Sequence, residues 1–278
     1  MRFTTKIVLG IFLSIFLLSL GAIIGFSFTD RVNYNWTSKG KLSISQENII
    51  SVDLKPYKTI RVEKDLYPGD KYNIHLQGTL YINPITASDE KNKLFLSEEL
   101  FQFSDIVSSN DTLIIRLQIK DLHEKYVANK PRKVSHLYVI EGFNFYVHTN
   151  TVDIISNLNG VSIDVRNIKT DKININTYGN AYIDSCQTGV IEPHVRGWHK
   201  SFRLKNSQVK ELNIDLDLMA GNWTVENCDI EVENLTGSGK YDVQLPKSEA
   251  KIMNWIPKDK DAKLNVTLYG DTARIVFP

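Results

Sequence analysis

A short pattern that recurs four times between residues 161 and 245 constrains the fold of this chain more than any other feature. Each copy has an apolar residue, a charged residue, Asn or Ser, a small or apolar residue, a polar residue, and then Thr, Val or Ile. The copies begin 18, 21 and 21 residues apart, at 165–170 (VRNIKT), 183–188 (IDSCQT), 204–209 (LKNSQV) and 225–230 (VENCDI). A fixed period near twenty residues, with strand-like alternation inside it, predicts the stacked coils of a β-solenoid.

Stacked coils place equivalent side chains above one another. Successive layers of a parallel coil lie about 4.8 Å apart, so each position of the repeat forms a column. One column should point into the interior, and its neighbour should hold polar side chains that hydrogen-bond along the stack. The expected inward column is Ile168, Cys186, Ser207 and Cys228, and the expected polar column is Asn167, Ser185, Asn206 and Asn227.

The two cysteines test this register. Cys186 and Cys228 are 42 residues apart, which places them two layers apart in the predicted coil. Their Cα atoms would then be roughly 9 to 10 Å apart, beyond the limit of about 7 Å for a disulfide. We therefore expect two buried free thiols. The alternative is an antiparallel sandwich whose strands recur at the same spacing by coincidence.

The N-terminus is apolar and precedes a long β-rich region. Residues 7–28 carry no charge, and as a helix these 22 residues would span about 33 Å, enough for the hydrocarbon core of a membrane. Arg2 and Lys6 precede them as in a secretory signal, but the segment exceeds the usual signal-peptide length. We therefore expect an uncleaved signal-anchor transmembrane helix at 1–28, a tether at 29–50 and an extracytoplasmic all-β domain at 51–278. That domain is predicted to be a single-stranded parallel β-helix with rungs of about 20 residues and an irregular C-terminal cap.

Strand-like runs also occur before the repeats. They are bounded by Gly, Pro or Asn, as strands commonly are. A charged stretch between two of them, residues 121–132, is expected to form a loop or one helical turn. The expected strands cover 59–63, 72–77, 79–83, 112–119, 134–140 and 144–148.

Several of these segments resemble a known family. Residues 57–62 (YKTIRV), 110–116 (NDTLIIR) and 136–139 (HLYV), followed by rungs with small residues at their turns, resemble the auto-transporter adhesin head-domain (GIN-like) β-helix family of bacterial envelope proteins. The resemblance covers roughly residues 55–245. It implies a right-handed parallel β-helix outside the bacterial inner membrane, in the periplasm or beyond, with an adhesive or scaffolding role. It supplies no catalytic residues.

Composition limits the partners. The chain has 33 basic and 32 acidic residues, and the basic residues are scattered rather than clustered. The chain therefore has no positive electrostatic field that would attract nucleic acid, so nucleic acid is excluded as a partner. The expected partners are the membrane, through the N-terminal helix, and an envelope protein or a glycan. No cofactor is predicted, because the sequence has no Gly-rich phosphate loop, no G-x-S-x-G elbow and no Cys-x-x-Cys pair.

The densest group of unusual side chains lies in residues 192–200 (EPHVRGWHK). Two histidines and a carboxylate could bind zinc, but an H-x4-H spacing matches no strong metal motif, and we predict no metal site. A Trp beside an Arg could stack on a sugar ring. The predicted ligand or partner contact therefore consists of Glu192, His194, Arg196, Trp198 and His199. A loop bulging into solvent would have the same sequence.

An enzyme is the alternative to a binding protein. A polysaccharide lyase or glycoside hydrolase built on a β-helix needs carboxylates that converge on one face. Asp215 and Asp217 alternate with leucines and so share an outward face, and Asp184 or Glu226 could lie near them on adjacent rungs. A solvated strand face explains the same pattern. The sequence therefore favours non-enzymatic adhesion, scaffolding or partner binding.

Overall fold

A computed structural model describes residues 41–65, 74–86, 91–126, 138–150, 152–197, 199–219, 223–245, 250–268 and 274–276. Within these ranges strands predominate, and three short helices interrupt them: α2 (Glu98–Phe101), α3 (Ile119–Tyr126) and α4 (Leu216–Met219). The strands are β1 (Lys41–Ser43), β2 (Ile49–Asp53), β3 (Thr59–Lys64), β4 (Ile74–Asn83), β5 (Lys93–Ser97), β6 (Ser104–Ser109), β7 (Thr112–Leu117), β8 (Tyr138–His148), β9 (Val152–Ser156), β10 (Val161–Arg166), β11 (Lys169–Thr177), β12 (Ala181–Asp184), β13 (Gln187–Val195), β14 (Phe202–Lys205), β15 (Gln208–Asp215), β16 (Trp223–Glu226), β17 (Asp229–Gly237), β18 (Lys240–Leu245), β19 (Ala250–Pro257), β20 (Lys263–Leu268) and β21 (Arg274–Val276).

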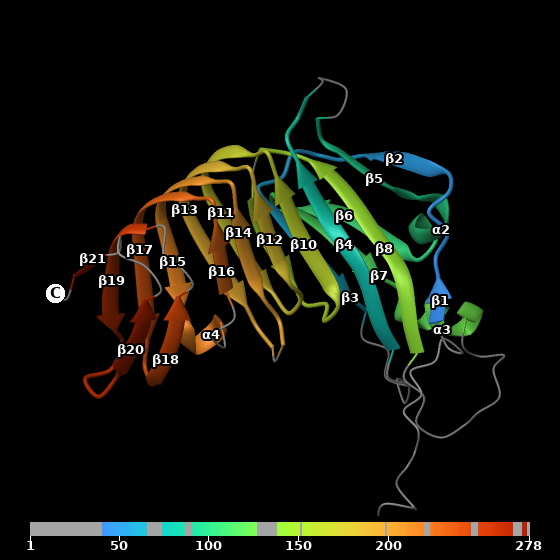
Figure 1. The fold of residues 1–278 in the computed structure, drawn as a ribbon. Helices are drawn as coiled ribbons and strands as arrows, with labels where there is room; N and C mark the ends of the chain where they lie inside the picture. The colour runs from blue at the N-terminus through green and yellow to red at the C-terminus, as the bar shows by residue number, and fades with distance from the viewer. Residues whose placement is uncertain are drawn as a thin grey trace, which may run out of the picture. The chain divides into compact units, whose positions relative to one another are not determined.

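The described strands form two large sheets and one small one (Figure 1). Sheet A has the order β16-β14-β12-β10-β4-β8-β5-β2, with β1 also paired to β8. Sheet B has the order β21-β19-β17-β15-β13-β11-β9-β3-β7-β6, and β18 and β20 pair separately. Alternate residues of both large sheets are apolar and belong to one buried cluster. The period-2 alternation in the sequence therefore produces a shared core.

The repeats stack in register, as the sequence predicts. Each repeat contributes one strand to sheet A and the next to sheet B, and all these strands pair in parallel. In sheet A, Ile183 pairs with Val165 on one side and Leu204 on the other, and Leu204 pairs in turn with Val225. These are the first residues of the four copies of the pattern.

The predicted fold class is nevertheless wrong, because the chain does not form a single-stranded parallel β-helix. The sheets are mixed: β5 is antiparallel to β2 and β8, and β6 is antiparallel to β7. The strands form separate sheets rather than a closed solenoid. The cause lies before the repeats, where hairpin segments between residues 93 and 117 add antiparallel strands to both sheets. The twenty-residue period describes only the region after β9.

The two predicted columns exist at the corners between the sheets. In the inward column Ile168, Cys186 and Ser207 are buried, and Ser207 joins two layers because its hydroxyl accepts from the Cys186 N–H at 3.0 Å. In the neighbouring column every residue has a left-handed backbone, which Asn and Ser tolerate better than branched residues. That column contains Asn167, Ser185, Asn206 and Asn227, with φ between 49° and 56°. The Asn227 amide donates to Asn206 Oδ1 at 3.4 Å, so polar side chains do bond along the stack.

Neither Cys186 nor Cys228 forms a disulfide, as expected, but only one of them is buried. Cys186 is 2% exposed, whereas Cys228 is half-buried. The expected burial of Cys228 is therefore wrong. It follows β16, the last strand of sheet A, so no further strand of that sheet covers its layer.

The two thiols should differ in reactivity. Burial raises the pKa of the Cys186 thiol to about 11, more than backbone hydrogen bonds lower it, so very little reactive thiolate exists at neutral pH. We expect a disulfide reagent to modify one thiol per native chain and two in denaturant. Cys228→Ser should abolish the native reaction and Cys186→Ser should leave it intact. Rapid modification of both native thiols would contradict this layer assignment.

Several expectations concern the ends of the domain. The predicted signal anchor at 1–28 lies outside the described residues, as do residues 29–40 of the predicted tether, while 41–50 contain β1 and the start of β2. No helix in the described ranges is long and apolar enough to cross a membrane. Near the C-terminus, where an irregular cap was expected, β19 and β21 extend sheet B by two more parallel strands.

Candidate functional site

Two of the predicted contact residues lie on the outer face of sheet B. Glu192 and His194 belong to β13, where they alternate with buried residues. They pair across the sheet with Asn174 and Asn176 of β11. Glu192 already forms an ion pair with Lys172 of β11, with 2.6 Å between the carboxylate and the ammonium nitrogen. The strand alternation therefore exposes these side chains, and the neighbouring strand neutralises the carboxylate.

The other predicted residues follow the end of β13. The Arg196 guanidinium lies over the Tyr178 ring, 6.0 Å from its centroid, in a cation–π contact. Gly197 and His199 both have positive φ, which makes this segment a tight turn. Trp198 lies outside the described residues. The structure thus brings Glu192, His194 and Arg196 to the same end of sheet B, and their role as a partner contact stays a prediction.

His194 is an unsuitable charge switch. Burial is the largest influence and lowers its pKa, and Arg196 and Lys258 lower it further, against the opposing effects of Asp215 and Glu192. The imidazole is therefore neutral at neutral pH. In the part of the chain that the structure describes, no three His, Cys, Asp or Glu side chains are grouped so as to hold a metal ion.

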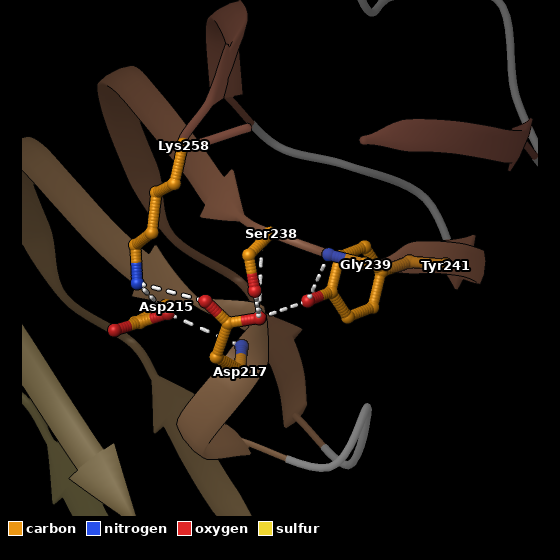
Figure 2. A network of polar contacts seen from close by, with 6 residues as sticks. All are labelled: Asp215, Asp217, Ser238, Gly239, Tyr241 and Lys258. Atoms are coloured by element: carbon orange, nitrogen blue, oxygen red, sulfur yellow. Dashed lines mark hydrogen bonds and ion pairs between the residues drawn. The ribbon is translucent and has the colours of Figure 1, made fainter. Parts of the chain in front are cut away.

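The two carboxylates considered for catalysis meet at a lysine (Figure 2). Asp215 is the last residue of β15, and Asp217 lies in α4, the helical turn that follows. The Lys258 ammonium, just after β19, lies 2.6 Å from Asp215 Oδ1 and 3.1 Å from Asp217 Oδ2. The Asp217 N–H also donates to Asp215 Oδ1 at 3.1 Å. One cation therefore bridges both anions across the layers of sheet B.

Asp217 has further partners in the turn between β17 and β18 and on β18. Its Oδ1 accepts from the Ser238 N–H at 3.0 Å and from the Ser238 hydroxyl at 2.9 Å. The Tyr241 hydroxyl donates to the same oxygen and accepts from the Gly239 N–H at 2.9 Å. Figure 2 shows Ser238, Tyr241 and Lys258 converging on this carboxylate, from the turn after β17, from β18 and from the residue after β19. The network ties three layers together.

This environment suits a structural clamp rather than acid–base catalysis. Burial alone would raise the pKa of Asp217, but the hydrogen bonds from Tyr241, Ser238 and Lys258 together hold it well below its usual range. Burial lowers the pKa of Lys258, but its two carboxylate partners outweigh that effect and raise it. A glycosidase pair needs one carboxyl that stays protonated near the working pH, and Asp217 cannot be that acid.

The wider acidic cluster expected for an enzyme is not formed. Asp184 and Glu226 lie on β12 and β16 of sheet A, whereas Asp215 and Asp217 lie at the end of a sheet B strand. Glu226 forms an ion pair with Lys205 at 2.6 Å, and Asp184 accepts from the Asn206 amide at 2.8 Å. Successive strands alternate between the two sheets, so acids that are close in the sequence lie on different faces.

The clamp predicts a specific pH dependence. The folded pKa of Asp217 lies below its value of about 3.8 in the unfolded chain, so its stabilising contribution is complete above that pH and is lost as the pH falls below it. Asp217→Asn removes this contribution. Between pH 7 and about pH 3, the free energy of unfolding should therefore fall less in the variant than in the wild type. Urea titrations at both pH values measure the difference, and Tyr241→Phe should give an intermediate fall. Equal falls in all three proteins would contradict the clamp.

A further group of outward-facing side chains was not predicted from the sequence as a candidate site. Four aromatic residues, Phe95, Tyr146, Tyr81 and Tyr182, occupy outward positions on β5, β8, β4 and β12 of sheet A. They are distant in the sequence, and three of them precede the repeats. The available signal was the alternation of aromatic and apolar residues within β4 and β8, which does not reveal that these strands are neighbours.

Comparisons with known proteins give structural neighbours only. No family model matches the chain, so the GIN-like β-helix family is not confirmed, and no curated protein matches it either. Similar solved structures include a "putative adhesin" from Bacteroides fragilis NCTC 9343, with 13% identity, a TM-score of 0.47 and coverage of 84% of this chain and 100% of that one. A "putative lipid binding protein" from Parabacteroides distasonis ATCC 8503 has 11% identity, a TM-score of 0.39 and coverage of 85% and 99%. At TM-scores below 0.5, function has to be inferred from the chain's own residues.

Proposed function

We propose that this chain is a non-enzymatic binding protein of the bacterial cell envelope, with an adhesion or scaffolding role. The observation that supports this most directly is the shared ion pair of Asp215 and Asp217 with Lys258. The carboxylate pair best placed for catalysis is occupied by a cation of the chain itself, and the Asp217 carboxyl keeps a low pKa. Acid–base catalysis needs a protonated acid beside a free base, and the Asp215–Asp217 pair provides neither.

The sheet faces suit binding. Parallel strands in register place outward side chains in straight rows, and such stacked surfaces are commonly used for recognition. On sheet B one row is polar and internally bonded: the Asn254 amide donates to Asn234 Oδ1 and the Asn234 amide to Asn213 Oδ1, each at 2.8 Å. A rigid row of paired side chains loses little conformational entropy when a partner binds.

The location outside the cytoplasm is part of the proposal and rests on the sequence. The uncharged segment 7–28, preceded by Arg2 and Lys6, has the composition of an export signal and the length of a membrane anchor. An anchored binding domain would hold its partner near the membrane. Protease accessibility of the domain in spheroplasts, compared with that in lysed cells, tests this location.

Binding and catalysis are separated by one pair of assays. Purified full-length protein is sedimented with peptidoglycan sacculi and with outer-membrane fragments, and the same samples are analysed for newly released reducing ends. We expect saturable co-sedimentation with one of these fractions and no release of reducing ends. The double variant Asp215→Asn with Asp217→Asn should still bind. Release of reducing ends by the wild type but not by this double variant would overturn the proposal, and so would the absence of binding to both fractions.

A further inference from the structure

The aromatic residues of sheet A form one row across the strands. Phe95 pairs with Tyr146, Tyr146 with Tyr81, Tyr81 with Asp164, and Asp164 with Tyr182. These five residues occupy the same register position on five neighbouring strands, β5, β8, β4, β10 and β12. All but Asp164 are half-buried and alternate with buried core residues. We call Phe95, Tyr146, Tyr81 and Tyr182 the aromatic row.

Three rings of the aromatic row are held in place by one another or by a neighbouring residue. Tyr81 and Tyr146 stack with their ring centroids 4.8 Å apart and an angle of 8° between the planes. Phe95 packs edge-on against His148, with centroids 5.5 Å apart. The 4.8 Å separation equals the usual spacing of neighbouring strands, so the sheet itself sets the period of the row. Little conformational freedom remains to be lost when a ligand contacts these rings.

Several charges around the row are paired within the protein. Arg166 binds both oxygens of Asp164, with 2.8 Å from Nε to Oδ1 and 2.7 Å from a terminal nitrogen to Oδ2. Further along the same face, Lys205 and Glu226 lie 2.6 Å apart. Arg203, which pairs with Tyr182 across the strands, adds an exposed guanidinium at the end of the row. The described part of this face therefore offers rings, hydroxyls and charges of both signs rather than a surplus of one sign. That combination favours an uncharged, hydroxyl-rich ligand over an anionic one.

We propose that the aromatic row of sheet A binds an extended, uncharged polysaccharide that lies across the strands. A pyranose presents apolar C–H groups that pack against the ring edges and faces that the Tyr81–Tyr146 stack leaves uncovered, and hydroxyls that bond to phenols and to paired carboxylates. The strand spacing is comparable with the rise of one sugar in an extended chain, so a periodic ligand contacts the row repeatedly. This inference rests on the proposed binding function and names the class of ligand.

A protein partner fits the face less well. The centre of a protein–protein interface is depleted of charged side chains, and its anchors sit in desolvated pockets. Here the Asp164–Arg166 pair interrupts the rings between Tyr81 and Tyr182. A straight row with a repeat along one direction matches a linear polymer better than a compact patch.

Native affinity electrophoresis of the full chain tests the inference. The gels contain hydroxyethylcellulose, xylan or galactomannan as uncharged probes, and polygalacturonate as the anionic probe. We expect at least one uncharged polymer to retard the wild type and polygalacturonate not to. Tyr81→Ala with Tyr146→Ala should weaken the retardation constant by about tenfold or more, because both members of the stacked pair are lost. Tyr182→Ala, which leaves the stacked pair intact, should weaken it severalfold.

Matched variants separate stacking from misfolding. Tyr146→Phe keeps the ring and should retain most of the binding, and Tyr178→Ala removes a ring that is 41% exposed but outside the row. Tyr178→Ala should bind like the wild type, and near-ultraviolet circular dichroism confirms that each variant is folded. The inference is overturned if folded row variants bind as tightly as the wild type, if Tyr178→Ala alone loses binding, or if only polygalacturonate retards the protein.

The outcomes also separate this inference from the proposed function. If no polymer retards the chain but it still sediments with envelope fractions, the polysaccharide assignment fails and the binding function stands. If the row variants lose binding to a protease-sensitive envelope component, the row is a protein contact and the inference fails. If the wild type binds nothing and releases reducing ends, both proposals fail.

Discussion

Replacing Phe145 with Ala should lower the free energy of unfolding by about 3 to 5 kcal/mol, the usual range for deleting a fully buried aromatic side chain. Phe145 lies in β8, is 0% exposed and belongs to the core shared by the two large sheets. Its removal leaves a cavity that the surrounding strands, fixed by hydrogen bonds on both sides, cannot close. Urea denaturation followed by tryptophan fluorescence measures the change.

The neighbouring residue provides the matched control. Tyr146 is similar in size and lies on the same strand, but it points outward and is half-buried. Tyr146→Ala should cost only about 1 kcal/mol, mainly through the lost stacking on Tyr81. Equal losses for the two variants would mean that β8 does not present alternate faces to core and solvent.

Replacing Gly179 with Ala should destabilise the protein by about 3 kcal/mol or more, although it adds one methyl group. A Cβ at this position would lie 1.9 Å from the carbonyl oxygen of Val161, in the layer below. The clash is with main chain, so no side-chain rotation relieves it. Two layers would have to separate locally, at the expense of hydrogen bonds between β10 and β12.

Gly239→Ala is the comparison for this prediction. Its added Cβ would meet the Tyr241 hydroxyl at 3.1 Å, and that group lies at the end of a flexible side chain. The expected loss is therefore less than half of that for Gly179→Ala. Thermal unfolding of both variants at one scan rate shows directly which substitution destabilises the protein more. A larger loss for Gly239→Ala would show that the close contact at Gly179 is relieved by movement of the backbone.

The part of the fold that was predictable is the part with a repeat. The four copies of the pattern specified which residues are equivalent, and Val165, Ile183, Leu204 and Val225 do pair in one row of sheet A. Before residue 152 the sequence has no period, and strands such as β4 and β8 pair through contacts between residues more than sixty positions apart. Local patterns identify such strands without specifying their partners, which is why the mixed sheets were missed.

The candidate residues show the same division. The alternation in 211–218 correctly predicted that Asp215 points outward. It did not predict that α4 interrupts the strand and turns Asp217 toward Lys258, some forty positions further along the chain. Residues 192–199 were noticed because they are adjacent in the sequence. The aromatic row was not noticed, because Phe95, Tyr81 and Tyr182 meet only through sheet topology.

The in-register stacking sets the unit in which this chain can change length. Gln187 and Gln208 occupy equivalent places one layer apart. Excising residues 187–207 would therefore join Cys186 to Gln208, which is equivalent to its present neighbour Gln187 in the repeat. One strand would leave each large sheet, and the remaining layers would meet with their inward and outward sides still matched. Deleting a single residue within a strand would instead turn the following side chains of that strand inside out. Gain or loss of whole coils is therefore the tolerated form of length variation, and it would lengthen or shorten the exposed faces without redesigning the core.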